Sequence, residues 1–183
     1  MLSNIEDIIN TYLVKLKDFE PLGDTPFRLN ALNGVYAPAK AGKTYFTLDQ
    51  LNSLDPDVYK VIWLDGDRNA ELKDKFKNIK HFPVTTPSDA LMAIIDSGND
   101  LTDHVLVIDS FKDFTFGYDI DNNKGCQNIL ETYQKLLDLG ATLIVILHAT
   151  KLSHMSYGDD FKLKGNADTI ESKMDFLYKT NII

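Results

Sequence analysis

Apolar residues in this chain follow two kinds of pattern, which predict buried strands and helices in alternation. Short runs that are apolar at every position are typical of strands covered on both faces. Segments between them repeat apolar residues at helical spacing. The predicted strands cover 35–37, 61–64, 81–84, 105–108 and 142–147, and the predicted helices cover roughly 44–53, 69–77, 88–97 and 125–139. This alternation predicts an α/β protein of three layers with a mostly parallel central sheet.

The two ends of the chain carry further patterns. Residues 3–19 place apolar side chains on one helix face after an N-cap at Ser3, so we expect an N-terminal amphipathic helix within residues 1–20. A connector follows, with a short strand expected at 27–32. The last ten residues are expected to form a closing strand or hairpin at the sheet edge. We therefore expect one core domain over residues 21–183.

Composition narrows the classes of function. The chain has 183 residues, 44% of them hydrophobic, which suits one domain with a substantial core. Its net charge of -8 opposes nucleic-acid binding by bulk electrostatics, so such binding requires a local basic patch. One cysteine excludes an internal disulfide. Cys126, His81 and His104 are expected to be structural. No secretory signal or membrane-spanning run is recognisable, and we expect a cytoplasmic location.

The segment Ala37-Pro-Ala-Lys-Ala-Gly-Lys-Thr44 nearly matches the phosphate-binding pattern G-x-x-x-x-G-K-[ST], between a predicted strand and a predicted helix. Backbone N–H groups at a helix N-terminus converge on an anion, Lys43 reaches the β and γ phosphates, and Thr44 can ligate Mg²⁺. Ala37 replaces the first glycine, which is tolerated where φ stays negative. The predicted nucleotide-binding residues are Ala37, Pro38, Ala39, Lys40, Ala41, Gly42, Lys43, Thr44 and Tyr45.

Two later strands end in carboxylates. Asp109 follows the strand over 105–108, and the carboxyl ends of strands are where open parallel sheets bind ligands. Asp109 is therefore a candidate Mg²⁺ ligand, with a turn or helix-cap acid as the alternative. Asp65 and Asp67 follow the strand over 61–64. One could orient the water that attacks the γ phosphate and the other could stand behind the metal ligands, or both could belong to an acidic turn.

Together these motifs resemble the RecA-like P-loop ATPases, within them the branch of plasmid and phage hexameric helicases. The resemblance spans about 33–178. APAKAGKT resembles the phosphate loop, WLDGD the strand that ends in the catalytic glutamate, VLVIDS the Walker B strand, and VILHATK the strand that ends in a sensor of the γ phosphate. The resemblance implies a RecA-like ATPase core, with ATP and Mg²⁺ as cofactors.

Residue roles follow from the same resemblance. It implies catalytic roles for Lys43, Asp67, Asp109, His148 and Lys164, and it implies Thr44 and Asp109 as metal ligands. Lys164, or Lys162 in its place, would reach the ATP site of a neighbouring subunit, so the resemblance also implies a homo-oligomeric ring or filament. The short chain beyond the closing strand suggests a bare core or a fragment.

The chain departs from the family in two respects. Asp67 is one methylene shorter than the family's glutamate, which predicts slow hydrolysis. Arginine occurs only at Arg28 and Arg68, so a cation supplied by a neighbour would be a lysine, which lacks the bidentate geometry of arginine.

The resemblance further implies single-stranded nucleic-acid contact through loops 110–125 and 152–164. Four aromatic side chains of the first loop could stack on bases or could pack beneath the loop. They are Phe111, Phe114, Phe116 and Tyr118. Aspartates in the same loop disfavour a phosphate backbone, so nucleic-acid binding rests on the resemblance and not on charge.

Three functions remain open from the sequence. The first is an oligomeric ATPase that acts in DNA replication, recombination or unwinding. The second is a slowly hydrolysing switch or adaptor with a protein partner. A small-molecule kinase ranks last, because the segment SYGDDFKLK offers no arginine to a transferred phosphoryl group.

Overall fold

The structure, a computed structural model, describes residues 18–38, 40–68, 74–151, 161–163 and 165–180. Its strands are β1 (Leu32–Pro38), β2 (Lys60–Asp65), β3 (Ile79–Pro83), β4 (His104–Asp109), β5 (Thr142–Lys151), β6 (Phe161–Leu163) and β7 (Phe176–Lys179). Its helices are α2 (Lys43–Asn52), α3 (Pro87–Ser97), the 3-10 helix η2 (Phe111–Asp113), α4 (Asn123–Asp138) and α5 (Ala167–Lys173). Within these ranges the chain is an α/β protein.

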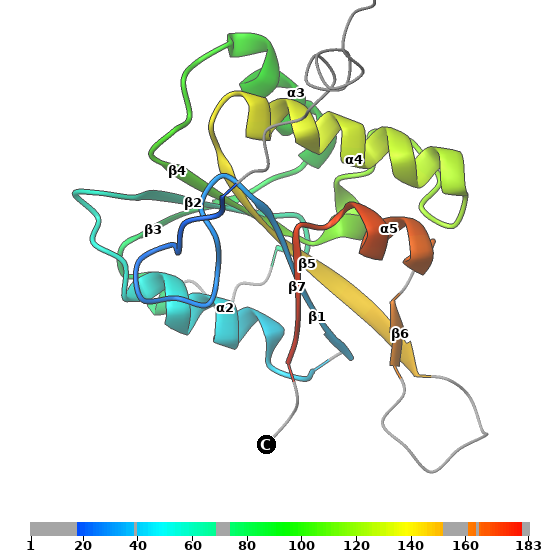
Figure 1. Cartoon of the computed structure of the whole chain (residues 1–183), viewed down its shortest axis with the longest axis horizontal. Helices are drawn as coiled ribbons and strands as arrows, with labels where there is room; N and C mark the ends of the chain where they lie inside the picture. Colours follow the sequence, from blue (N-terminus) through cyan, green and yellow to red (C-terminus); the bar gives the residue numbers. More distant parts are fainter. Residues whose placement is uncertain (1–17, 39, 69–73, 152–160, 164, 181–183) are drawn as a thin grey trace, which may run out of the picture.

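Six of the strands form one parallel sheet in the order β3-β2-β4-β5-β1-β7, and β6 adds to the end of β5 in antiparallel pairing (Figure 1). Because the six strands are parallel, their carboxyl ends share one edge of the sheet. At that edge Asp65 of β2 lies opposite Asp109 of β4, and Ala37 of β1 lies opposite His148 of β5. The ends of four strands that carry candidate residues are therefore neighbours.

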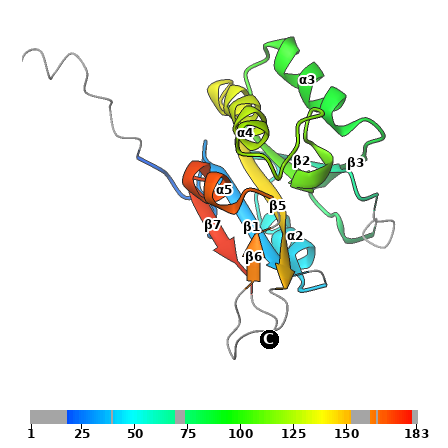
Figure 2. The ribbon, with the colours of Figure 1, turned by 90° about the vertical axis from the view of Figure 1, so that its right-hand side faces the viewer.

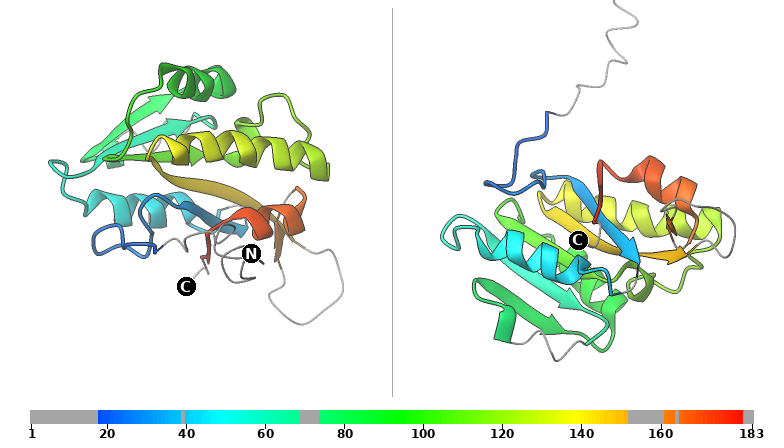
Figure 3. Two further views of the ribbon diagram at one scale, coloured as in Figure 1. Left: turned by 45° about the horizontal axis from the view of Figure 1, so that its top comes forward. Right: turned by 90° about the horizontal axis from the view of Figure 1, so that it is seen from below.

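Helices cover both faces of the sheet, which gives three layers (Figure 2, Figure 3). One face packs against α2 through Leu48 and Leu51, around the fully buried Trp63. The other face packs against α3, α4 and α5, with Tyr133 of α4 among its largest buried side chains. The predicted three-layer arrangement and parallel sheet are confirmed. None of the helices in the described ranges is both long and apolar enough to cross a membrane.

The predicted elements agree with the structure for α2, α3 and α4 and for the strands β1 to β5. The closing segment is a strand, β7, at the edge of the sheet beside β1. Three of the elements given above were not anticipated, namely η2, β6 and α5. The predicted N-terminal helix lies almost wholly in residues 1–17, outside the described ranges.

Two predicted elements differ from the structure where it describes them. Of the helix predicted at 69–77, residues 74–75 are 3-10 helical and residues 76–77 are not helical, because the Asn52 side chain donates to the Lys75 carbonyl and accepts from the Lys77 N–H, which takes these groups away from helical bonding. The strand expected at 27–32 is reduced to an isolated bridge at Arg28. There the Asn33 side chain bonds both backbone groups of Arg28, and the chain turns before β1 begins.

Candidate functional site

The loop between β1 and α2 wraps around the amino end of α2. Ala37 is part of β1 and buried, so its backbone is extended and does not need glycine. The left-handed conformations fall instead on Lys40, with φ of 63°, and on Gly42, with φ of 77°, which is the N-cap of α2. The N–H of Ala41 donates to the carbonyl of Pro38 at 3.2 Å and closes the turn.

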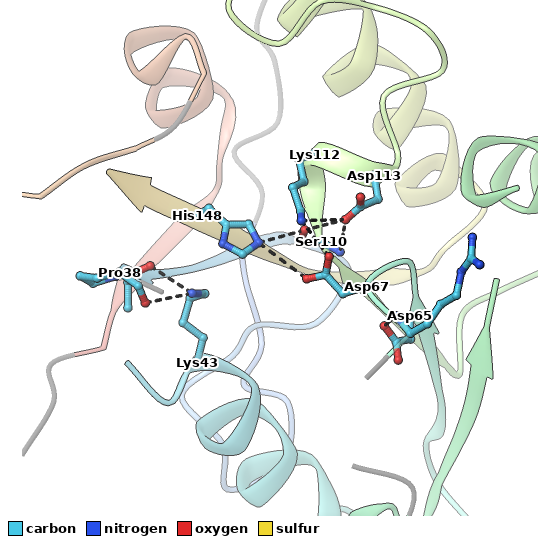
Figure 4. A network of polar contacts seen from close by, with 10 residues as sticks. Pro38, Lys43, Asp65, Asp67, Ser110, Lys112, Asp113 and His148 are labelled. Carbon is cyan, nitrogen blue, oxygen red and sulfur yellow. Dashed lines mark hydrogen bonds and ion pairs between the residues drawn. The ribbon is translucent and has the colours of Figure 1, made fainter. Parts of the chain in front are cut away.

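Lys43 is held inside this loop. Its side chain is buried, and Nζ donates to the carbonyls of Ala37 at 3.1 Å and Pro38 at 3.2 Å (Figure 4). Burial lowers the pKa of Lys43, whereas the negative charges of Asp109 and Asp67 act in the opposite direction. The ammonium therefore lies within electrostatic range of two carboxylates from other parts of the chain, since Asp109 ends β4 and Asp67 lies two residues after β2.

The carboxylates after β2 have different surroundings. Asp65 is fully buried, with Oδ2 3.0 Å from Nε2 of His81 and Oδ1 accepting from the N–H of Arg68 at 2.7 Å. His81 also stacks on Phe76, so its predicted structural role is supported. Asp67 is exposed and faces the residues after β4 (Figure 4). Both acids lie close enough to Asp109 to act on its charge, and Asp67 also contacts Lys112 and lies 3.9 Å from His148.

Asp109 ends β4 as a buried carboxyl group. Burial and the nearby charges of Asp65 and Asp67 raise its pKa to about 7. The positive charge of Lys43 opposes this shift. Three carboxyl groups at the ends of two neighbouring strands thus create a strongly negative local field, and a cation would relieve it.

A polar network joins the segment after β4 to β5 and to the segment after β2 (Figure 4). The Ser110 hydroxyl donates to Asp113 at 2.8 Å and lies 3.1 Å from Nε2 of His148. Nζ of Lys112 donates to Oδ1 of Asp67 at 2.8 Å, and Oδ2 of Asp67 is 3.9 Å from Nε2 of His148. His148 is thereby brought beside Asp67.

The charge states of this network follow from its contacts. Burial and the positive charges of Lys43 and Lys112 lower the pKa of His148, so its imidazole is neutral at neutral pH. The hydrogen bond to Asp67 raises the pKa of Lys112, which stays an ammonium ion. Ser110, Lys112 and Asp113 were not predicted as site residues. The only sequence signal was their closeness to Asp109, and nothing local indicated that Lys112 reaches Asp67.

The donor set fits Mg²⁺ bound together with a nucleotide. Asp109 offers a carboxylate at the end of β4, and Thr44 offers a hydroxyl in the first turn of α2. Mg²⁺ is usually held by one or two protein oxygens together with substrate phosphates and water. Among the described residues, no three His, Cys, Asp or Glu side chains are grouped to hold a metal by themselves. A magnesium ion at this edge would accordingly depend on phosphate oxygens as further ligands.

The remaining predicted residues are not all part of the described site. Ala39 and Lys164 lie outside the described residues, and of Lys162 only its place in β6 is described. Tyr45 is 52% exposed on α2, with Nζ of Lys75 5.5 Å from the centre of its ring. Cys126 is buried in α4, and burial raises its pKa to about 11, which fits the predicted packing role.

The loop over 110–125 contains both buried and exposed aromatic rings. Phe111 and Phe114 are buried in the core against α4, and the Tyr133 hydroxyl donates to the Phe114 carbonyl at 3.2 Å. Phe116 is half-buried, and its ring centre lies 6.1 Å from that of Tyr133. Tyr118 is 44% exposed. Phe111 and Phe114 therefore pack beneath the loop, which was one of the two alternatives. Tyr118 is the exposed aromatic side chain for which stacking on bases stays a prediction.

Comparison with known proteins does not add a family to this picture. No protein-family model matches the chain, and a search of curated proteins finds no match. The fold and the site define an α/β protein with charged side chains gathered at the carboxyl edge of a parallel sheet.

Proposed function

We propose that this protein is a RecA-like P-loop ATPase that binds ATP with Mg²⁺ and hydrolyses it at the carboxyl edge of the sheet. The observation that carries the proposal is the position of Lys43, whose ammonium group lies in the loop before α2 and within electrostatic range of Asp109 and Asp67. The loop and the two acids come from three different strands. Their convergence supports a triphosphate site with a metal ligand and a base.

Each side chain has a definite role in this proposal. Lys43 would exchange its loop carbonyls for β and γ phosphate oxygens, and the N-terminus of α2 would add backbone N–H groups. Thr44 and Asp109 would hold Mg²⁺, which supplies positive charge against the phosphates. Asp67 would orient a water molecule and accept its proton as the water oxygen bonds to the γ phosphorus. The bond from that phosphorus to the bridging oxygen then breaks, which yields ADP and inorganic phosphate.

His148 would report on the γ phosphate. Its neutral ring lies between Lys43 on one side and the Ser110 hydroxyl on the other (Figure 4). Because the Ser110 hydroxyl donates its proton to Asp113, Nε2 of the neutral imidazole donates to the Ser110 oxygen, and it would exchange that oxygen for a γ phosphate oxygen. Hydrolysis of the nucleotide would in this way change the hydrogen bonding of Ser110, and through it the position of η2 and the loop that follows it.

The proposal is tested by measuring ATP binding and steady-state hydrolysis. Lys43→Ala is expected to weaken ATP binding by roughly 10- to 100-fold, because it removes hydrogen bonds to charged phosphate oxygens. Asp67→Asn is expected to reduce turnover while it leaves ATP affinity nearly unchanged. Lys135→Ala, an exposed lysine in the last turn of α4, is the matched control. Equal ATP binding by the wild type and Lys43→Ala would contradict the proposal that Lys43 belongs to a nucleotide-binding site.

The second candidate is a slowly hydrolysing switch that acts on a protein partner. The burial of Phe111 and Phe114 and the net charge of -8 favour it over direct nucleic-acid action. Turnover measured with and without single-stranded DNA separates the two candidates. Stimulation that disappears in Lys43→Ala supports an oligomeric ATPase of DNA replication, recombination or unwinding. ATP binding with little turnover and no response to DNA supports the switch.

A further inference from the structure

Lys112 makes a contact that the sequence did not predict. Its Nζ donates to Oδ1 of Asp67 at 2.8 Å and lies 3.9 Å from Oδ2 of Asp113 (Figure 4). Both Lys112 and Asp67 are 38% exposed as side chains. Ion pairs this exposed contribute little to stability, because solvent screens them and two long side chains lose freedom. A stabilising role does not account for the pair, so its position in the site needs a different explanation.

The backbone brings these two residues together at a fixed distance. Gly66, just before Asp67, donates its N–H to the carbonyl of Asp109 at 2.6 Å. A Cβ atom at Gly66 would come within 2.7 Å of Cβ of Asp113, so only glycine allows this approach. Ser110 and Asp113 form a capping box that closes η2 around Lys112. The turn after β2 and the start of η2 therefore pack directly against each other.

We infer that Lys112 is a positioning residue for Asp67, an inference that rests on the proposed ATP hydrolysis. A carboxylate that turns freely presents either oxygen to a water molecule and holds neither at a fixed place. Lys112 holds Oδ1, whereas Oδ2 lies 3.9 Å from Nε2 of His148, which is longer than a hydrogen bond. Oδ2 thus stays able to accept from the attacking water while its direction is set by Lys112.

This role also addresses the short side chain of Asp67. Catalysis of phosphoryl transfer depends mainly on position and charge, and small errors in the position of the attacking group lower the rate steeply. The ammonium of Lys112 restricts the Asp67 side chain and keeps a positive charge on the same protomer. The same chain therefore supplies two lysines to the site, Lys43 and Lys112.

The test compares kcat and KM for ATP in Lys112→Met and Lys112→Arg with the wild type. Lys112→Met keeps the length of the side chain and removes its charge, and it is expected to lower kcat by roughly 10- to 100-fold with KM within about twofold. Lys112→Arg is expected to restore most of the rate, because it returns a cation to Oδ1. Lys135→Met, at an exposed lysine in the last turn of α4, is expected to match the wild type.

A double variant shows whether Lys112 acts through Asp67. If it does, Lys112→Met in the Asp67→Asn background is expected to be no slower than Asp67→Asn alone. Unchanged kcat in Lys112→Met, equal losses in the Met and Arg variants, or additive losses in the double variant would overturn the inference. Wild-type ATP binding without turnover would also overturn it and leave the nucleotide site intact. Failure of the nucleotide site itself is recognised separately, by Lys43→Ala.

Discussion

Asp109 and Lys43 are charged side chains that the fold buries at the carboxyl edge of the sheet. Buried charges cost free energy unless they are paired, and the carboxyl group of Asp109 responds by holding its proton up to a pH of about 7. Proteins retain such groups where function requires them. The pH dependence of stability is therefore a direct way to measure the environment of Asp109.

Asp109→Asn is expected to stabilise the protein in the absence of Mg²⁺ and nucleotide. The pKa of Asp109 is raised, so the native state holds a proton that the unfolded chain releases above pH 4. Stability from this group is consequently lost as the pH rises from about 4 to 7 and is constant above. Urea denaturation at pH 8 is expected to show a gain on the order of 2 kcal/mol, with a smaller gain at pH 5.

An exposed acid provides the control for this experiment. Hydrogen bonding to Lys60 lowers the pKa of Asp103, which is the opposite direction from Asp109. Asp103→Asn is therefore expected to lose a little stability at pH 8. A gain for Asp109→Asn that does not change between pH 5 and pH 8 would contradict the raised pKa.

At the scale of elements, the ends of strands and the loop after β4 decide what the site contains. Register places the last residues of β2 and β4 opposite each other, and it places Asp109 opposite Ile146 of β5 and Ala37 of β1 opposite His148 of β5. The loop over 110–122 is anchored on α4 through buried Phe111 and Phe114, and the N–H of Phe116 donates to Ser88 of α3 at 2.8 Å. Lys112 is consequently held on a packed segment and not on a free loop.

Two aromatic residues of this loop are expected to respond differently to truncation. Phe114→Ala removes a fully buried ring and is expected to cost about 3–5 kcal/mol, whereas Tyr118→Ala is expected to change stability by less than about 0.5 kcal/mol. Urea denaturation measures both. If the loop stacks on bases, Tyr118→Ala is also expected to weaken single-stranded DNA binding in fluorescence anisotropy. Equal stability losses would contradict the packing described for Phe114.

At the scale of the molecule, the sheet is a frame, and the candidate residues lie at the edge where β2 and β4 end (Figure 1). One protomer supplies two lysines to this edge, Lys43 and Lys112. A further cation from a neighbouring subunit, Lys164 or Lys162, stays a prediction from the family resemblance. Such a cation requires that protomers assemble with the site at their interface.

Assembly is expected to depend on nucleotide. Light scattering after size exclusion is expected to give a larger molar mass for the wild type with ATP and Mg²⁺ than without them, because a nucleotide at an interface links binding to association. Lys43→Ala, which should lose the nucleotide, is expected to show no such increase. A monomer under every condition would contradict a lysine supplied by a neighbour and would leave Lys112 as the cation beside Asp67.

The amino-acid sequence alone predicted the helices and strands and their layer arrangement. Apolar periodicity predicted the parallel sheet and its three layers, and motif spacing predicted that a helix starts at about Thr44, one residue from its observed start, and that Asp109 ends a strand. These features depend on neighbours in the chain, which a sequence displays directly. Ala37 was expected to be tolerated for the same reason, since an extended residue before the turn does not need glycine.

Tertiary structure decided what depends on distant segments. It separated Asp65, which contacts His81, from Asp67, which contacts Lys112 across 45 residues. It also buried Phe111 and Phe114, which the sequence left open between stacking and packing. Polar side chains have no periodic signal for their partners, because strand register and loop packing bring them together. The sequence by itself therefore determined the frame and the candidate phosphate loop, whereas only the fold decided which charges meet at its edge.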